Sequence, residues 1–451
     1  MRLKVFSELR LNRLQMFQDS KRKRSRGAPA VVIRKNKPKW RRVKCFQLKF
    51  GTAADTFRLP QFLVDTMETS SASPPIKKAL TGLSRLVVTS SFSGVGFAEL
   101  GLQSLLASKN HDLKVKRQVE INRHCREVLL SRNHSGCVFD DIQALVPDFE
   151  MGTAAKPPRC RSSAVKAYCH QHARLCPVAP KKMLGQLHLE VAGPPCPPWS
   201  RFGCRRGESD IRHRAHDAWV SLCRQEEPDL ILFENVVGYK LELLDKNFAD
   251  KYRVLPEILD PRLFGAPMSR PRVYSLLVHK SLDWKGTEAS WLLDAVKAAG
   301  GEVHSSDSSS TYDNRIYAEL PDDGSRRHMT SKEHARLEAY NGLKRLGEAT
   351  VVDLTQSAKK PVASLVDGAL PVLRTSCRGL YMRHAQQFLS CFQLLRAMGY
   401  PVHPSDAAQM SLGHCPLPSL PKEKLFTMIG NGMFPACVAL AVLTAMLHID
   451  L

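Results

Sequence analysis

The chain has 451 residues, of which 43% are hydrophobic, so it is long and apolar enough for two or three domains with a sizeable core. No apolar stretch approaches the length that spans a bilayer, and we expect no membrane partner. The 13 cysteines are an odd number and no secretory signal is visible, which favours reduced thiols in an intracellular protein. The net charge of +23 predicts a polyanion as the partner.

Positive charge is concentrated in the first 50 residues, which hold 17 Lys and Arg against two acids. The run Lys21-Arg22-Lys23-Arg24 is typical of a nuclear address or of an arm that binds nucleic acid. A solvated disordered tail and an organelle transit peptide are the alternatives. We interpret residues 1–82 as a basic, largely disordered extension with a Ser- and Pro-rich linker at residues 70–75. We expect a nuclear protein, with an organelle as the alternative location.

Strands and helices alternate from about residue 83 onward, which predicts an α/β fold with a parallel sheet and right-handed crossovers. We expect strands at residues 86–88, 115–120, 187–191, 230–233 and 272–278, a possible strand before Asp141, and helices that end near residue 107 and span 122–132 and 434–447. Two stretches break this rhythm. Residues 143–186 are basic and contain Cys and His, and residues 280–390 are polar and long enough for a small irregular domain.

The segment Gly193-Pro194-Pro195-Cys196-Pro197 follows the strand expected at residues 187–191. In open α/β sheets, ligands bind at the carboxyl ends of the strands. Because proline fixes φ, the turn holds the Cys196 thiol in one position, as a nucleophile requires. A buried structural cysteine is the alternative for such a segment taken alone.

Several residues at the ends of the early strands suit a nucleoside-bearing cofactor. Gly94 and Gly96 let the backbone turn tightly where a helix begins. Glu120 ends the second strand, where a carboxylate can accept hydrogen bonds from ribose hydroxyls. Asp141 can receive an adenine amino group, and Ile142 can pack on the ring. The third glycine of the dinucleotide fingerprint is missing, so we expect no long phosphate tail.

Polar groups also follow the later strands. Glu234 comes directly after four apolar residues, and burial there would raise its pKa until it can donate a proton near neutral pH. Arg270 and Arg272 flank a proline and can bind a phosphate or donate to a carbonyl oxygen. Asn431 either caps the last helix or contacts a ligand.

In chain order, seven motifs resemble those of cytosine-C5 methyltransferases: Phe92-Ser93-Gly94-Val95-Gly96, Glu120, Asp141-Ile142, Pro194-Pro195-Cys196, Glu234-Asn235-Val236, Arg270-Pro271-Arg272 and Ile429-Gly430-Asn431. The resemblance covers roughly residues 84–449. It implies a Rossmann-like class I methyltransferase sheet with a last antiparallel strand, S-adenosylmethionine as methyl donor, and a small irregular target-recognition domain.

The resemblance also implies roles for these residues. The donor would be held by Phe92, Gly94, Gly96, Glu120, Ile121, Asp141, Ile142 and Asn431. Cys196 would attack C6 of cytosine, Glu234 would bind N3 and Arg272 would bind O2. Arg270 would support the pocket or a phosphate. The target base would have to be flipped out of the duplex.

The family pattern divides the chain into a catalytic domain at residues 83–279 with the insertion 143–186, a target-recognition region at 280–390, and a segment at 391–451 that returns to the catalytic domain. Three residues depart from the pattern. Pro197 and Met268 stand where Gln is frequent, and Phe97 stands where Gly is frequent. None of them removes a group that performs chemistry, so we expect an active enzyme.

The insertion carries residues that could bind zinc, namely Cys160, Cys169, His170, His172 and Cys176. Their spacing matches no established ligand pattern, so we expect no metal and interpret the insertion as disordered and basic.

These features predict a DNA (cytosine-5-)-methyltransferase that uses S-adenosylmethionine. A tRNA cytosine-C5 methyltransferase and a catalytically silent nucleic-acid-binding relative are the alternatives. DNA is the expected partner, RNA is the second possibility, and no obligate protein partner is inferred.

Overall fold

The computed structural model describes residues 60, 74–107, 111–132, 136–147, 149–150, 159–160, 165–180, 184–200, 203, 205–264, 266–286, 324, 327–343, 351–364, 369–413, 417 and 420–450. All of them belong to one compact unit, residues 44–451. The predictions for the basic arm and for most of the first part of the target-recognition region fall outside the described residues.

Helix α3 (Pro74–Ser84) opens the described fold. Ala79 and Leu83 are buried in the same hydrophobic cluster as the last helix. Proline is well tolerated in the first turn of a helix, because the N–H groups there have no intrahelical acceptor. The prediction of a poorly ordered extension up to residue 82 is therefore wrong for residues 74–82, which join the core through one apolar face.

Seven strands form the central sheet in the order β10-β11-β9-β8-β1-β2-β3. All neighbours are parallel except β11, which runs antiparallel to β9 and to β10. The strands are β1 (Leu86–Ser91), β2 (Lys114–Val119), β3 (Cys137–Phe139), β8 (Leu187–Ala192), β9 (Leu230–Val236), β10 (Tyr252–Leu259) and β11 (Arg272–His279). The predicted α/β class and the antiparallel last strand are confirmed.

Edge strand β10 was not predicted from the sequence. Pro256 lies in its middle, and a proline within an apolar run argues against a strand because it cannot donate to the ladder. The structure resolves the conflict by placing β10 at the edge of the sheet, where proline is tolerated.

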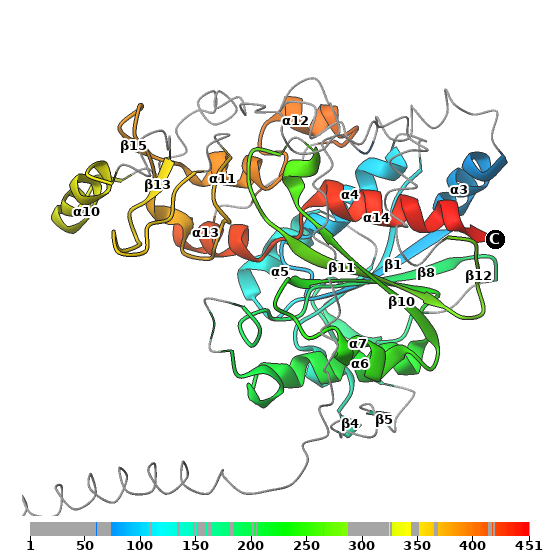
Figure 1. The fold of residues 1–451 in the computed structure, drawn as a ribbon. Coiled ribbons are helices and arrows are strands. Elements are labelled where there is room, and N and C mark those ends of the chain that lie inside the picture. Colours follow the sequence, from blue (N-terminus) through cyan, green and yellow to red (C-terminus); the bar gives the residue numbers. More distant parts are fainter. Residues whose placement is uncertain are drawn as a thin grey trace, which may run out of the picture. The chain divides into compact units, whose positions relative to one another are not determined.

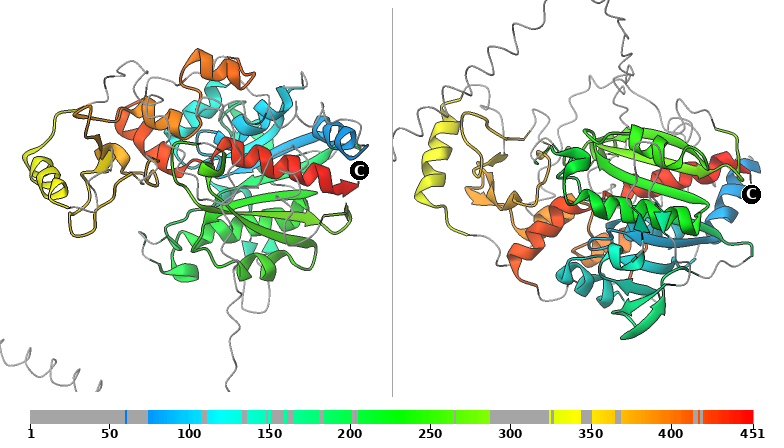
Figure 2. Two further views of the ribbon diagram at one scale, coloured as in Figure 1. Left: turned by 45° about the horizontal axis from the view of Figure 1, so that its top comes forward. Right: turned by 90° about the horizontal axis from the view of Figure 1, so that it is seen from below.

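Helices cover both faces of the sheet (Figures 1 and 2). On one face α3 and α4 (Phe97–Ala107) pack against α14 (Pro435–His448), and on the other face lie α6 (His213–Glu226) and α7 (Glu242–Phe248). Because both faces are covered, β1 and β8 are buried along their whole length. Helix α5 (Arg123–Ser131), whose N-cap is Asn122, follows β2 as predicted.

The C-terminal helix α14 is apolar on all sides and ends within one residue of its predicted position. By length and composition, residues 422–448 pass as a membrane span, which the sequence analysis did not anticipate. In the structure, 83% of that window is buried, as is common for the core helix of a folded domain.

The insertion contains an ordered hairpin. Strands β6 (Lys166–Cys169) and β7 (Arg174–Pro177) pair antiparallel, and the short strands β4 (Phe149–Glu150) and β5 (Arg159–Cys160) form a second pair. The N–H of His170 donates to the carbonyl of Val138 in β3 at 2.8 Å, which fastens the hairpin to the edge of the central sheet. The prediction of a disordered insertion is therefore wrong for residues 165–180.

The described part of residues 280–451 begins with β12 (Asp283–Trp284), which pairs with β16 (Ile449–Asp450). Helix α10 (Ser331–Asn341) packs on a small sheet of β13 (Val351–Asp353), β14 (Leu380–Met382) and β15 (Gln387–Phe388) through a separate apolar cluster. Helices α11 (Cys391–Ala397), α12 (Pro404–Gln409) and α13 (Lys422–Asn431) then lead back to α14.

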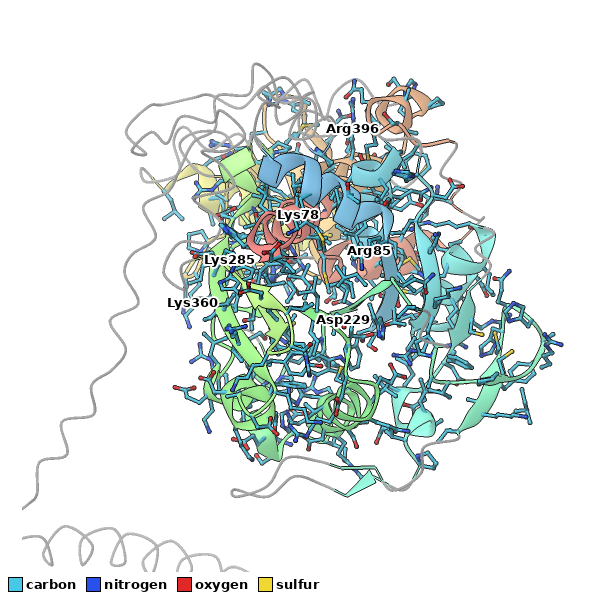
Figure 3. The ribbon with its side chains drawn as sticks, turned by 90° about the vertical axis from the view of Figure 1, so that its right-hand side faces the viewer. Lys78, Arg85, Asp229, Lys285, Lys360 and Arg396 are labelled. Carbon is cyan, nitrogen blue, oxygen red and sulfur yellow. The ribbon has the colours of Figure 1, made fainter. Side chains whose placement is uncertain are left out.

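The amino ends of the parallel strands lie opposite the expected site. Figure 3 faces this end, where Arg85 and Asp229 immediately precede β1 and β9. Asp229 accepts a hydrogen bond from the N–H of His188 at 2.8 Å, which ties the starts of β8 and β9 together. Strand order reverses at the β1–β8 junction, so a crevice for a ligand is expected at the carboxyl ends of these two strands.

Candidate active site

The Cys196 thiol lies in the loop that follows β8, at the carboxyl edge of the sheet. The N–H groups of Trp199 and Ser200 both donate to the Cys196 carbonyl at 2.9 Å, so the loop closes into a helical turn directly after the thiol. Pro195 and Pro197 flank Cys196 and restrict the backbone on both sides. The predicted turn is present, and Cys196 is half-buried in it.

The Glu234 side chain comes from the neighbouring strand β9. We predicted it just after the strand, but β9 continues to Val236, so Glu234 is held by pairing with Tyr274 of β11. Only 8% of Glu234 is exposed. The adjacent Asn235 is also buried, and its Nδ2 donates to the Pro194 carbonyl at 3.1 Å. This hydrogen bond joins the strand that carries the carboxyl group to the loop that carries the thiol.

Cys196 and Glu234 are close enough to influence each other's ionisation. Burial raises the pKa of Cys196, the charge of Glu234 raises it further, and Arg272 and Arg270 oppose both effects. Burial also raises the pKa of Glu234, again against the two arginines. Burial thus disfavours the charged forms of both side chains, and the two guanidinium groups favour them.

Arg272 completes this group as the first residue of β11. Its Nε lies 3.3 Å from Glu234 Oε1. Even so, Oε1 receives no hydrogen bond from the residues that the structure describes, although it is buried. A buried carboxyl oxygen without a donor is costly, so this atom is available for a ligand that carries one.

The Arg270 guanidinium is not positioned to bind a phosphate, which was one of its two predicted roles. Its guanidinium donates to three backbone carbonyls, those of Leu373 at 3.3 Å, Gly430 at 3.2 Å and Gly432 at 2.7 Å. Burial is the main cause that lowers its pKa to about 10. Arg270 thus holds the segment around Asn431 and supports the pocket, which was the other role anticipated for it.

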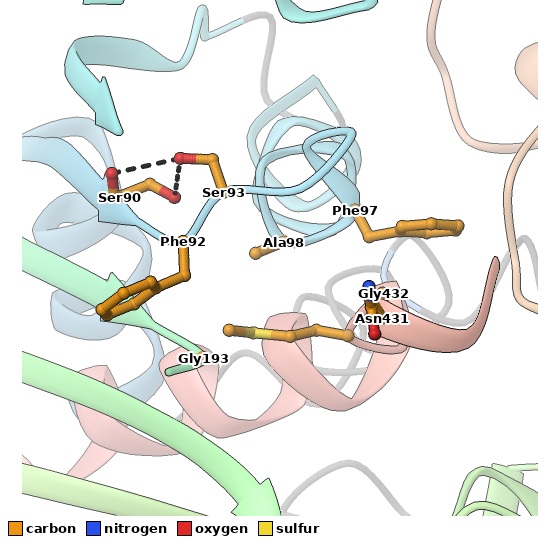
Figure 4. A pocket seen from close by; sticks show the side chains of 9 residues that line it. Ser90, Phe92, Ser93, Phe97, Ala98, Gly193, Asn431 and Gly432 are labelled. Atoms are coloured by element: carbon orange, nitrogen blue, oxygen red, sulfur yellow. Dashed lines mark hydrogen bonds between the residues drawn. The ribbon is translucent and has the colours of Figure 1, made fainter. Parts of the chain in front are cut away.

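A pocket opens at the β1–β8 junction, where the strand order reverses. Figure 4 shows Phe92 and Ser93 on one side of it and Gly193 and Asn431 on the other. Asn431 ends α13 and α14 begins only at Pro435, so Asn431 lines the pocket and is not the cap of the last helix. Residues more than 330 positions apart in the chain thus meet at the predicted donor site.

Glu120 follows β2 at the same edge. Its Oε2 accepts from the N–H of Gly94 and its Oε1 from the N–H of Asn122, both at 2.8 Å. Burial raises the pKa of Glu120, and these two N–H groups oppose the rise. Phe92, Gly94 and Gly96 all adopt positive φ, as the predicted tight turn requires. The carboxylate and the turn are therefore one connected unit.

The residues that follow the third strand contribute less to the predicted donor site than the sequence suggested. Asp141 accepts from the N–H of Gln143 at 2.9 Å and caps a short 3₁₀ turn at the carboxyl edge. Ile142 is only 3% exposed and packs in the core, so it is not free to lie on an adenine ring. Ile121, by contrast, is 70% exposed beside Glu120, which makes it the better apolar surface for a base.

Comparisons with known proteins agree with this arrangement. The model of the C-5 cytosine-specific DNA methylase family matches residues 178–364, the segment that contains Cys196, Glu234 and Arg272. Over this segment the chain is similar to the C-5 cytosine-specific DNA methylase family, which supports the resemblance predicted from its motifs. The motif of Phe92 and the segment of Asn431 lie outside the matched residues.

Individual relatives match shorter stretches. The chain is 30% identical over 110 residues to the orphan methyltransferase M.Rho11sI of Bacillus phage rho11s, covering 23% of this chain and 22% of the relative. It is 31% identical over 103 residues to the type II methyltransferase M.MthTI of Methanothermobacter thermautotrophicus, covering 21% and 31%. The chain thus matches less than a third of the length of either. A crystal structure of the S. pombe Dnmt2 methyltransferase has a TM-score of 0.47 and 15% identity, over 79% of this chain and 96% of that one.

Two of the three departures from the family pattern, Met268 and Phe97, lie in the apolar core, and the third, Pro197, is half-buried beside Cys196. Met268 is fully buried. On one side of it the Ser269 N–H donates to the Leu370 carbonyl at 2.9 Å, and on the other the Leu370 N–H donates to the Pro267 carbonyl at 2.8 Å. Phe97 begins α4 and packs edge-on against Tyr400 with ring centroids 5.6 Å apart. Both side chains are therefore accommodated by packing, and Phe97 also lines the pocket at the β1–β8 junction.

Sequence reasoning missed three contributors to the candidate site. Asn235 was quoted only as part of a motif, although a buried amide beside a buried acid is itself a signal. Asp260 accepts from the Arg270 N–H at 3.0 Å and from Ser269 Oγ at 3.1 Å, and so shapes the arginine segment. A Cβ at Gly193 would lie 2.7 Å from Met433 Cε, so a larger residue there would displace the end of the Met433 side chain in the pocket.

Proposed function

We propose that the chain is an S-adenosylmethionine-dependent DNA (cytosine-5-)-methyltransferase that works through a covalent bond between Cys196 and the target base. The observation that carries the proposal is the grouping of a thiol, a buried carboxyl group and a guanidinium at one edge of the sheet. Glu234 has an unsatisfied buried oxygen beside Cys196 and Arg272. This is the set of groups that cytosine C5 chemistry needs.

The residues at the β1–β8 pocket fit the methyl donor. The fit rests on the glycine turn, on the Glu120 carboxylate bonded into it and on the exposed Ile121. Asn431 would close the pocket from the far end of the chain, and Arg270 holds that segment in position. When bound, S-adenosylmethionine supplies an electrophilic methyl group for C5.

The chemistry at the base falls to three side chains. Cytosine C5 is a poor nucleophile, and attack of the Cys196 thiolate on C6 moves the electron pair of the C5–C6 bond toward C5 and N3. Glu234, whose pKa is raised by burial, donates a proton to N3 and stabilises that charge. Arg272 donates to O2 of the base. After C5 is methylated, a base removes the C5 proton, the C5–C6 double bond forms again, the Cys196 thiolate leaves, and N3 returns its proton to Glu234.

The target base would be extruded from the duplex to reach Cys196, at a cost of a few kcal/mol of unstacking. The basic arm at residues 1–50 would add contacts to phosphates that do not depend on sequence. The run at residues 21–24 supports a nuclear location, with an organelle as the alternative.

The test supplies the purified full-length chain with labelled S-adenosylmethionine and, separately, with duplex DNA and with tRNA. Label on cytosine C5 of DNA, absent from the Cys196→Ala variant, is the expected result. Label on tRNA alone would assign the chain to RNA. No label on either substrate, together with no covalent adduct on DNA that contains 5-fluorocytosine, would identify a catalytically silent protein.

A further inference from the structure

Four potential metal ligands meet where the β6–β7 hairpin contacts the edge of the central sheet. They are Cys137, at the start of β3, and Cys169, His172 and Cys176, from the hairpin and its turn. Their three sulfur atoms and one imidazole nitrogen all lie within 4.8 Å of one another. None of them takes part in the proposed methyl transfer.

The geometry is that of a tetrahedral centre. The Nδ1 atom of His172 lies 3.3 Å from Cys169 Sγ, 3.5 Å from Cys176 Sγ and 3.6 Å from Cys137 Sγ. With Zn–S of about 2.3 Å and Zn–N of about 2.0–2.1 Å, a regular tetrahedron has S···N edges of about 3.6 Å. Two of the three separations lie within 0.1 Å of that value, and the separation from Cys169 Sγ is 0.3 Å shorter.

Packing of free thiols alone does not account for this arrangement. Cys169 and Cys176 are buried, but His172 is exposed and still directs Nδ1 at all three sulfurs. The turn that brings it there includes Ala173 in the left-handed region, with φ of 50°. A residue with a Cβ pays about 1–2 kcal/mol for that conformation, which the surrounding contacts must offset.

A backbone N–H group beside the four ligands can stabilise a metal-bound thiolate. The N–H of Val138 points at Cys169 Sγ from 3.4 Å. The nearby His170, which the sequence also offered as a ligand, instead faces Asp140 at 3.6 Å. The local spacing Cys169-x₂-His172-x₃-Cys176 supplies three of the four ligands, whereas Cys137 is contributed by a strand 32 residues upstream.

We propose that Cys137, Cys169, His172 and Cys176 bind one zinc ion. Four protein ligands leave no open coordination position, so the site is structural rather than catalytic. Zinc fastens the hairpin at residues 165–180 to β3. Strand β3 leads directly to Asp141 at the carboxyl edge of the sheet, so the ion also steadies the donor side of the pocket. The proposal does not depend on the proposed methyl transfer.

The first test uses inductively coupled plasma mass spectrometry to measure the metal content of the full-length chain. The protein is expressed with zinc and freed of loosely bound ions before the measurement. About one zinc per chain is expected, falling to below about 0.1 in Cys169→Ser and Cys176→Ser. Cys125→Ser, another buried free cysteine, and His170→Gln should keep the metal. Zinc-free wild-type protein that takes up no zinc when it is supplied would overturn the proposal.

A second variant separates this site from the other metal-competent group, His213, His216 and Asp217. If His213→Gln loses the zinc and Cys176→Ser keeps it, the ion belongs to that group and the proposal is wrong.

A measurement on the wild-type chain guards against variants that fail to fold. Alkylation followed by peptide mapping should find Cys137, Cys169 and Cys176 protected in the zinc-loaded protein and modified after a strong chelator is added. The Co²⁺-substituted protein should give the intense visible bands of tetrahedral thiolate coordination. Equal alkylation of the three thiols with and without zinc would contradict the proposal.

Discussion

The side-chain amide of Asn235 donates to the carbonyl oxygen of Pro194 at 3.1 Å, and both groups are buried. Asn235 directly follows Glu234 on β9, and Pro194 precedes Cys196 by two residues in the loop after β8. One hydrogen bond therefore fixes the separation of the two groups proposed to act on the base. Since about 1 Å of misplacement can cost a hundredfold in rate, this bond is expected to affect catalysis as well as stability.

Replacing Asn235 by Ala should lower kcat by roughly 10- to 100-fold and the free energy of unfolding by about 1–3 kcal/mol, because the Pro194 carbonyl loses its donor. The measurements are single-turnover methyl transfer and urea unfolding. Asn247→Ala is the matched control, since Asn247 is a buried amide on α7, away from the site. It should change stability without changing kcat. Equal losses of kcat in the two variants would argue against a positioning role for Asn235.

Glu234→Gln should lower methyl transfer by about 10²- to 10⁴-fold, the range expected for loss of an acid catalyst. It should also change the pH dependence of stability. Burial raises the folded-state pKa of Glu234 above its unfolded value, so the stability linked to its protonated form is complete below the unfolded pKa and is lost as pH rises through the folded pKa. Between pH 5 and pH 8, the wild type should therefore lose more stability than Glu234→Gln.

Glu208 provides a control of opposite sign for this comparison. Its hydrogen bond from Lys240 lowers its pKa, so its contribution is present above the unfolded pKa and is lost as pH falls through the folded pKa. Because Glu208 is exposed, Glu208→Gln should track the wild type closely in denaturant titrations at the same two pH values. If Glu234→Gln and the wild type fall in parallel, the carboxyl group of Glu234 does not have a raised pKa.

The sequence predicted most of the sheet because its strands are short apolar runs that end in polar motifs. Cys196 and Glu234 could be placed together because carboxyl ends of parallel strands share one edge. Arg272 reaches the same edge from the start of the antiparallel strand β11. The contacts of Arg270, by contrast, depend on Leu373, Gly430 and Gly432, more than 100 residues away, and no local pattern encodes them. Ile142 was assigned to the donor because an apolar side chain after Asp141 could pack on the adenine ring, but the chain turns this side chain into the core. Cys137 was missed as a possible metal ligand because it lies far in the sequence from Cys169, His172 and Cys176, so no local pattern includes it.

Arg270→Gln should weaken the binding of S-adenosylmethionine more than it lowers the rate of methyl transfer to the bound base. Three buried carbonyls would lose a charged donor, at a cost of at least about 2 kcal/mol in unfolding free energy, and the segment around Asn431 would loosen. Calorimetric titration with S-adenosylmethionine should give a dissociation constant raised by roughly 10-fold or more. Arg272→Gln is the comparison, because Arg272 faces Glu234 and not the segment of Asn431. An unchanged dissociation constant in Arg270→Gln would show that the hydrogen bonds of Arg270 to the three backbone carbonyls do not shape the donor pocket.

The basic arm should determine how steeply DNA binding falls with salt. Each phosphate that a Lys or Arg neutralises releases a counterion and contributes about 0.9 to the slope of log affinity against log salt. The double variant Lys21→Ala/Arg22→Ala should therefore reduce that slope by up to about 2, measured by fluorescence anisotropy with duplex DNA between low and physiological salt. The double variant Lys78→Ala/Lys285→Ala removes the same charge from residues that pair with Asp450 and Asp283 near the amino ends of the strands (Figure 3). It should leave the slope unchanged, whereas equal changes in both variants would mean that net charge, not the arm, attracts the DNA.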